Sequence, residues 1–198
     1  MKFSEKPRKR KGQFFLIAGL MLAILFFMGL PKPDSMVQGP VAEDLKHVYE
    51  NMEREFGRAL ALGLNESLGV DKLQNFTRFV DGALKTRYIG FDCLWVVAEG
   101  NTSSIINLSV GNFLGNEINM TLNLTDDGGS SAIKYIGVNS DTTSFLEFGS
   151  VTSDFNMTIS FNTSDEAATV VWERDKVNLY VFMNLTRSNN IKRDDFDL

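Results

Sequence analysis

The chain has 198 residues, one Cys, one His and a formal net charge of −5. A single Cys excludes an intramolecular disulfide, and one Cys with one His excludes the usual Cys/His metal sites and most nucleophile–base pairs. The length indicates one domain plus an anchor. The protein body is acidic and repels phosphate, so we expect no nucleic-acid partner.

The N-terminal segment has the pattern of a membrane anchor. Residues 1–12 form a basic leader with six Lys or Arg and one Glu, a net charge of +5, so the other 186 residues carry −10. Residues 13–30 contain no charge, and as a helix they span about 27 Å, close to the thickness of the hydrocarbon core. Pro31 and Pro33 end this helix and open a linker over 31–40.

The charge asymmetry predicts the topology. A basic leader before the span, with an acidic region after it, predicts a single-pass protein of the cell membrane whose N-terminus is cytoplasmic and whose C-terminal domain is extracytoplasmic. Residues 13–30 would then contact membrane lipid. A cleaved signal peptide is the alternative, but no convincing small-residue cleavage site follows the apolar run.

Residues 41–86 are predicted to form a helical stem or hairpin. Between Ala42 and Leu68, apolar residues recur at spacings of three and four, which is the period of an amphipathic helix. The segment 71–74 resembles a capping box and predicts the start of a second helix there. The apolar positions are Leu45, Val48, Met52, Phe56, Leu60 and Leu64 in the first helix, and Leu73, Phe76, Val80 and Leu84 in the second.

Residues 87–190 are predicted to form a β-rich head. The run 88–100 is strongly apolar and predicts a central strand, whereas 118–125, 155–162 and 177–186 alternate polar with apolar residues, as strands with one buried face do. The fold class is therefore α+β, with an N-terminal transmembrane helix, two amphipathic helices and an antiparallel β-sandwich or open barrel of seven or eight strands.

Two finer expectations concern the end of the chain. Arg174 and Asp175 are predicted to form the turn of a hairpin that joins 167–173 to 176–182. The charged residues 191–198 are predicted to be a flexible tail.

Asn-x-Ser/Thr triplets are unusually dense. Random placement of 16 Asn and 27 Ser or Thr predicts about two such triplets, but nine occur, all after the apolar span. Alternation of Asn and Thr on the polar faces of strands explains some of them, but not Asn65 and Asn75 in the helical region. We therefore predict N-glycosylation, with candidate acceptors Asn65, Asn75, Asn101, Asn107, Asn119, Asn123, Asn156, Asn162 and Asn184.

The sequence contains no catalytic constellation, phosphate loop or Cys/His metal spacing, so we expect neither an enzyme nor a cofactor. His47 lies beside the first helical stripe and is interpreted as a surface or packing residue, and Cys93 as a small buried hydrophobe. Trp95 and Trp172 are interpreted as buried rather than as platforms for sugars. Carboxylates in predicted loops are interpreted as solvated turn residues, with calcium binding as the alternative: Asp126, Asp127, Asp141, Asp154, Asp165 and Glu166.

The junction between the basic leader and the apolar run also resembles a known processing signal. Lys11, Gly12 and Gln13, followed by the hydrophobic stretch, resemble the class III signal of type IV prepilins, and most closely the archaeal version, in which a prepilin peptidase cuts after the glycine. The resemblance covers about 20 residues. Two features depart from it: Ile17 stands where many pilins have Glu, and prolines break the helix that usually continues into the head.

With its basic leader, acidic body and dense triplets, the chain resembles small archaeal cell-surface glycoproteins of the pilin type. The resemblance implies cleavage between Gly12 and Gln13, a prepilin peptidase and an oligosaccharyltransferase as processing partners, and copies of the chain or other pilin-like subunits as assembly partners. The predicted function is that of a surface structural or interaction protein, a pilin-like subunit or minor pilin. The alternative, favoured by the proline break, is a monomeric membrane-tethered domain that binds a ligand or partner.

Overall fold

The computed structural model describes residues 41–65, 69–100, 104–162, 167–188 and 190–198. The predicted leader, apolar span and linker, including Gly12 and Gln13, lie outside these residues. Among the helices within these ranges, none is long and apolar enough to cross a membrane. The chain divides into two compact units, Met1–Gly39 and Pro40–Leu198, and the description below concerns the second.

Two helices form a hairpin, as predicted. Helix α2 spans Val41–Asn65 and helix α3 spans Gly69–Lys85. The ring of Phe56 meets that of Phe76 edge to face, with the centroids 5.1 Å apart. Helix α3 begins two residues earlier than expected, so Asp71 lies in its first turn, where its carboxylate faces the positive end of the helix dipole.

The end of α3 adopts a Schellman motif. The backbone N–H of Ile89 donates to the carbonyl of Leu84 and that of Tyr88 donates to Lys85, both at 3.1 Å. Tyr88 has a φ of 57°, a left-handed conformation that this motif usually gives to glycine. Its side chain is 90% exposed, whereas Leu84 and Ile89 are buried. The motif turns the chain from the helix into the first strand.

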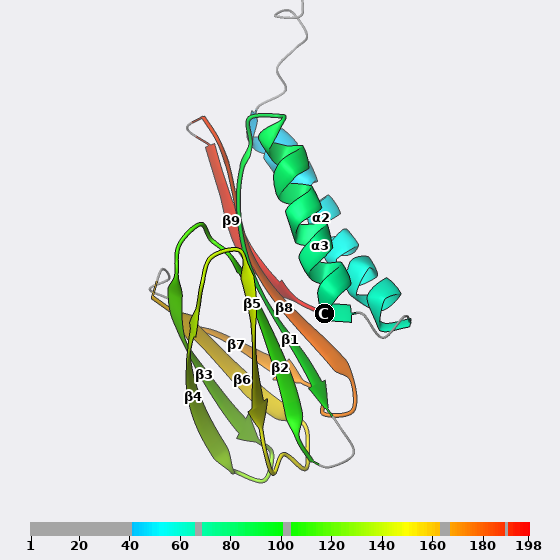
Figure 1. The fold of residues 1–198 in the computed structure, drawn as a ribbon, viewed down its shortest axis with the longest axis vertical. Helices are drawn as coiled ribbons and strands as arrows, with labels where there is room; N and C mark the ends of the chain where they lie inside the picture. The colour runs from blue at the N-terminus through cyan, green and yellow to red at the C-terminus, as the bar shows by residue number, and fades with distance from the viewer. Residues whose placement is uncertain (1–40, 66–68, 101–103, 163–166, 189) are drawn as a thin grey trace, which may run out of the picture. The chain divides into compact units, whose positions relative to one another are not determined.

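Within the described ranges, nine strands build two antiparallel sheets, one or two strands more than predicted (Figure 1). The first sheet has the order β5-β2-β1-β8-β9 and the second the order β4-β3-β6-β7. The bounds are β1 Gly90–Gly100, β2 Ile106–Phe113, β3 Ile118–Asp126, β4 Ser131–Val138, β5 Thr142–Phe148, β6 Phe155–Phe161, β7 Ala168–Trp172, β8 Val177–Arg187 and β9 Asn190–Asp197. The sheets pack as a sandwich, and the helix hairpin covers the other face of the first sheet.

The first sheet is therefore buried on both faces at its centre. In β1, Cys93 and Trp95 belong to the cluster beneath the helices, whereas Leu94 and Val96 belong to the core between the sheets. Strand β8 has the same double burial. This position explains why 88–100 is apolar without interruption, since a strand between two hydrophobic layers has no polar face.

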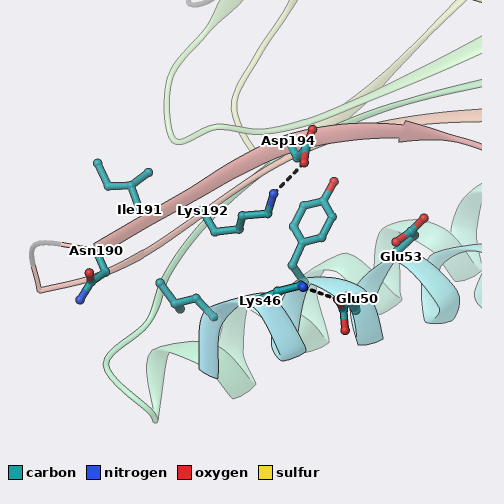
Figure 2. Close-up of a pocket in the computed structure, with 9 residues that line it drawn as sticks. Lys46, Glu50, Glu53, Asn190, Ile191, Lys192 and Asp194 are labelled. Atoms are coloured by element: carbon teal, nitrogen blue, oxygen red, sulfur yellow. Dashed lines mark hydrogen bonds and ion pairs between the residues drawn. The ribbon is translucent and has the colours of Figure 1, made fainter. Parts of the chain in front are cut away.

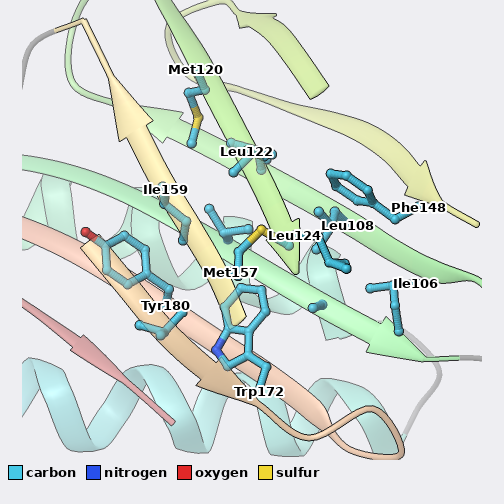
Figure 3. Close-up of a cluster of buried hydrophobic side chains, with 14 of the residues drawn as sticks. Ile106, Leu108, Met120, Leu122, Leu124, Phe148, Met157, Ile159, Trp172 and Tyr180 are labelled. Atoms are coloured by element: carbon cyan, nitrogen blue, oxygen red, sulfur yellow. The ribbon is translucent and has the colours of Figure 1, made fainter. Parts of the chain in front are cut away.

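The second sheet is buried on one face only, as the alternating pattern predicts. Met120, Leu122 and Leu124 of β3 point into the core, together with Met157 and Ile159 of β6 (Figure 3). The residues between them are exposed or half-buried. The outer face of this sheet is thus the polar surface on the side of the sandwich away from the helices.

The predicted flexible tail forms a strand in the structure. Asn190–Asp197 pairs with β8 as the edge strand β9, from Arg187↔Asn190 to Tyr180↔Asp197. The prediction relied on the charge of this segment. At an edge, however, the charged side chains can stay at the surface while the backbone pairs, and Arg193 lies over the ring of Phe182, 4.9 Å from its centroid.

The predicted hairpin at Arg174 and Asp175 is wrong. Strand β7 pairs with β6 in the second sheet, whereas β8 pairs with β1 and β9 in the first, so the turn passes between the sheets. The burial patterns give the reason. Strand β7 alternates and suits the second sheet, which is buried on one face only, whereas β8 is buried on both faces and suits the first sheet, which lies between the helices and the second sheet.

Asn112 of β2 is a buried link between the two sheets. Its side chain is fully buried, and its Nδ2 donates to the carbonyls of Val138 and Asn116, each at 2.8 Å. Its Oδ1 accepts from the backbone N–H of Leu114 at 3.0 Å. Because Val138 ends β4, this amide ties the first sheet to the second. Its polar atoms are all paired, as buried amides require.

Candidate functional site

A pocket of about 430 Å³ lies between helix α2 and the edge strand β9 (Figure 2). Its buried lining comes from Leu45 and Tyr49. The volume falls within the range of small-molecule sites in proteins, about 300–1,000 Å³. The remaining lining is Lys46, Glu50 and Glu53 from α2 and Asn190, Ile191, Lys192 and Asp194 from β9.

The hydroxyl of Tyr49 is a buried polar group of this pocket that has no hydrogen bond. The residue is 6% exposed, and its Oη has no partner within the described part of the chain. A buried hydroxyl left unpaired costs about 1–3 kcal/mol, and a ligand that displaced the side chains covering this atom would gain a hydrogen bond to it. The ammonium of Lys192 lies over the ring, 4.9 Å from its centroid.

Carboxylates dominate the surroundings of this hydroxyl. Burial, followed by the charges of Asp194 and Glu53, raises the pKa of Tyr49 above its ordinary value of 10.0. The hydroxyl therefore stays protonated at neutral pH and is no nucleophile. Lys192 pairs with Asp194 at 2.7 Å. The negative field that raises this pKa suits a protonated amine better than an anion.

The outer face of the second sheet is a second candidate surface. Pairing places Asn119, Thr121, Asn123 and Thr125 of β3 beside the outward residues of β4 and β6. In register, these form rows such as Ile133–Asn123–Thr158–Thr169 and Ser131–Thr125–Asn156–Val171. None of the residues that these strands present on this face is charged, although 23% of the whole chain is.

Three of the candidate glycosylation sites share this face. Asn119 and Asn156 are exposed, and Asn123 is half-buried between Ile133 and Thr158. A fourth, Asn162, is exposed beside Asn119, whose backbone N–H donates to the Asn162 Oδ1 at 3.2 Å. The fold thus gathers triplets that are up to 43 residues apart in the sequence.

Two other candidate acceptors have less accessible triplets. Asn75 is exposed on α3, but Thr77 of the same triplet is fully buried and donates from Oγ1 to the carbonyl of Leu73 at 2.8 Å. Asn184 lies on the face of β8 that is turned toward the second sheet. Its Nδ2 donates to the Asp92 carboxylate at 2.9 Å, and its Oδ1 is buried.

The remaining acceptors are scattered. Asn107 is exposed on β2 between Glu99 and Glu147. Asn65 is the last residue of α2, and Asn101 lies outside the described residues.

The other residues singled out in the sequence do not converge on one site. Cys93, Trp95 and Trp172 are at most 1% exposed, as interpreted. His47 is exposed on α2, with its Nδ1 3.7 Å from Glu50.

The loop carboxylates have separate roles. Asp126 Oδ1 accepts from the Ser130 N–H at 2.8 Å and closes the β3–β4 turn, and Asp154 Oδ1 accepts from the Arg174 N–H at 2.9 Å. Among the described residues, no group of three or more His, Cys, Asp or Glu is placed to hold a metal ion, and Asp165 and Glu166 lie outside them.

Sequence reasoning missed two of the polar groups described above. Tyr49 lies four residues after Leu45 and seven before Phe56, so the helical spacing already placed it on the apolar face of the first helix. Asn112 stands between Gly111 and Phe113 in a strand whose neighbours are apolar, and a lone amide in such a run is the signal that was available. No protein-family model matches the chain, and the comparison with curated proteins finds no match.

Proposed function

We propose that this chain is a membrane-anchored, N-glycosylated surface structural or interaction protein, a pilin-like subunit or minor pilin. The observation that carries the proposal is the outer face of the second sheet, where candidate acceptors gather on strands that present no charged residue there. The basic leader, the apolar span and the Lys11-Gly12-Gln13 junction support the same proposal from the sequence.

The division of surfaces supports this role. The helix hairpin shields one side of the first sheet, and the face away from it is rich in hydroxyl and amide groups. Such a face suits bulky, solubilising sugars. In the proposed topology, residues 13–30 anchor the protein in the membrane and the sandwich stands outside it.

The test is mass spectrometry of the protein purified from native membranes. A mature N-terminus at Gln13, together with sugar-bearing peptides, is the expected result. A Gly12→Val variant is expected to retain the leader, and a Lys11→Arg variant, which keeps the positive charge, is the matched control. An intact Met1 on the mature protein would contradict the proposed prepilin-type processing. Recovery of the protein from native membranes solely as a monomer would contradict the proposed role as a subunit.

A second candidate function rests on the pocket beside β9. Its volume and the unpartnered Tyr49 hydroxyl favour a monomeric tethered domain that binds a small amine or a basic side chain. Titration of the purified chain with N-acetyl-lysine methylamide, followed by NMR, tests this function. Shifts at residues of the pocket that are lost in Tyr49→Phe support it, and shifts of equal size in both proteins count against it.

A further inference from the structure

The candidate acceptor asparagines differ in whether the side-chain nitrogen is exposed or is hydrogen-bonded within the fold. We propose that the outer face of the second sheet is the glycan-bearing face, with Asn119 and Asn156 as acceptors whose sugars cover Tyr135, Ile133 and Val171, and that Asn184 is a structural amide that carries no glycan. The inference rests on the proposed N-glycosylation and assigns it to particular sites.

Asn119 and Asn156 have room for a sugar. Both side chains are exposed on the outer face, on neighbouring strands β3 and β6. Gly137, the β4 partner of Asn119, has no side chain of its own, and the Glu117 carboxylate lies beside it. Thr121 and Thr158, the third residues of the two triplets, are half-buried on the same face. Neither asparagine donates its side-chain nitrogen to another described group.

The apolar residues of this face supply an independent argument. Tyr135, Ile133 and Val171 are 79%, 54% and 73% exposed, on a face where the strands themselves present no charged residue and the Glu117 carboxylate lies only beside Gly137. Val171 is the direct strand partner of Asn156, and Tyr135 pairs with Thr121, two residues from Asn119. Uncharged sheet faces with exposed apolar groups favour association. Sugars on the two asparagines would cover these side chains.

Asn184 has the opposite environment. It lies on the inner face of the first sheet, between its strand partners Asp92 and Arg193, and its Oδ1 is buried. Its Nδ2 is held by Asp92 at 2.9 Å. A glycan on that nitrogen would have to pass the side chains of Phe182 and Leu114, which line the same small hollow.

The covalent step is a glycosyl transfer. The side-chain nitrogen of Asn119 or Asn156 attacks the anomeric carbon of a lipid-linked glycosyl phosphate. The bond between that carbon and the phosphate oxygen breaks, and the lipid phosphate leaves with the bonding electrons. The amide loses one proton to a base of the transferase, and an N-glycosidic bond forms without any change of oxidation state.

Glycopeptide mass spectrometry of the full chain from native membranes is the first test. The expected result is sugar on Asn119 and Asn156 and an unmodified Asn184. An unmodified Asn119 or Asn156, or a modified Asn184, while other triplets carry sugar, overturns this inference and leaves the proposed glycosylation standing. A chain without sugar at any triplet overturns both.

Substitutions test what the sugars do. Asn119→Gln with Asn156→Gln is expected to remove both glycans and to shift the detergent-solubilised chain to larger particles in light scattering. Thr121→Ser keeps the triplet and is the matched control. Tyr135→Ser with Val171→Thr, added to the chain that lacks these two glycans, is expected to reverse the shift. If that chain keeps the wild-type particle size, or if the reversal fails, the sugars do not cover these residues.

Discussion

The amide of Asn112 allows a quantitative test of what joins the two sheets. Asn112→Ala removes three hydrogen bonds, two to the carbonyls of Val138 and Asn116 and one from the N–H of Leu114. A typical net contribution is about 0.5–1.5 kcal/mol for each bond, and the groups left behind are partly buried. We therefore expect a loss of about 3 kcal/mol in the free energy of unfolding, a large fraction of a domain's stability.

The assay is urea unfolding of the full chain, followed by tryptophan fluorescence. Trp95 lies in the cluster beneath the helices and Trp172 lies between the sheets, so the signal reports both hydrophobic layers. With a slope of about 2 kcal/mol per molar urea, the expected loss lowers the midpoint by about 1.5 M. Asn116→Ala, which keeps the accepting carbonyl, is the control and is expected to cost less than about 0.5 kcal/mol.

Asn112→Asp makes the test sharper. A carboxylate keeps the acceptor for Leu114 but turns an unpaired charge toward the carbonyls of Val138 and Asn116. Burial and these oxygens raise the pKa of the new carboxyl group in the folded protein. The Asn112→Asp variant is therefore most stable at low pH, and it loses stability as the pH rises above about 3.9, the ordinary pKa of Asp. A loss below about 1 kcal/mol for Asn112→Ala at pH 7, or equal losses for Asn112→Ala and Asn116→Ala, would refute the reasoning.

Three further predictions concern the backbone and the buried titratable groups. Tyr88→Gly relieves a left-handed φ on an exposed residue and is expected to raise stability by about 0.5–1 kcal/mol in the same assay, with Tyr88→Ala near neutral. Gly111→Ala brings a methyl group to 2.1 Å from the indole beneath it and is expected to lower the urea midpoint by more than 1 M, whereas an unchanged midpoint contradicts this packing. Burial raises the pKa values of Cys93, Tyr49 and Tyr180 above their ordinary values of 9.0 for Cys and 10.0 for Tyr, so the unfolded chain releases these protons first. The stability they confer is present below pH 9 and lost above it, and equal urea midpoints at pH 8 and pH 10.5 would count against this linkage.

The sequence predicts those helices and strands whose buried residues recur at a regular spacing along the chain. The stripe through Leu45 and Phe56 indicated α2, and the alternation around Met120 and Met157 indicated strands with one buried face. Periodicity carries no information on which sheet a strand joins. The predicted hairpin at Arg174 is therefore wrong, because the double burial of β8 requires a place in the sheet that is covered on both faces.

The edge strand β9 and the residues that pairing brings together from distant parts of the chain could not be predicted from the sequence. Strand β9 is held by its backbone pairing with β8 and by surface contacts such as Arg193 over Phe182, so its composition resembles that of a solvated tail. The triplets at Asn119 and Asn156 were visible, but their common face depends on the pairing of β3 with β6. The isolated setting of Asn184 depends in the same way on its partner Asp92.

The pairing of β1 with β8 sets the order in which this domain can fold. Trp95 pairs with Val181, 86 residues later, so the centre of the first sheet closes only after most of the chain has been synthesised. Contacts this distant slow folding, because a long loop must close before they form. Strands β3 and β6 lie closer together in the sequence and pair without β8. Asn119 and Asn156 therefore emerge and can meet a glycosyltransferase while β1 still lacks its central partner.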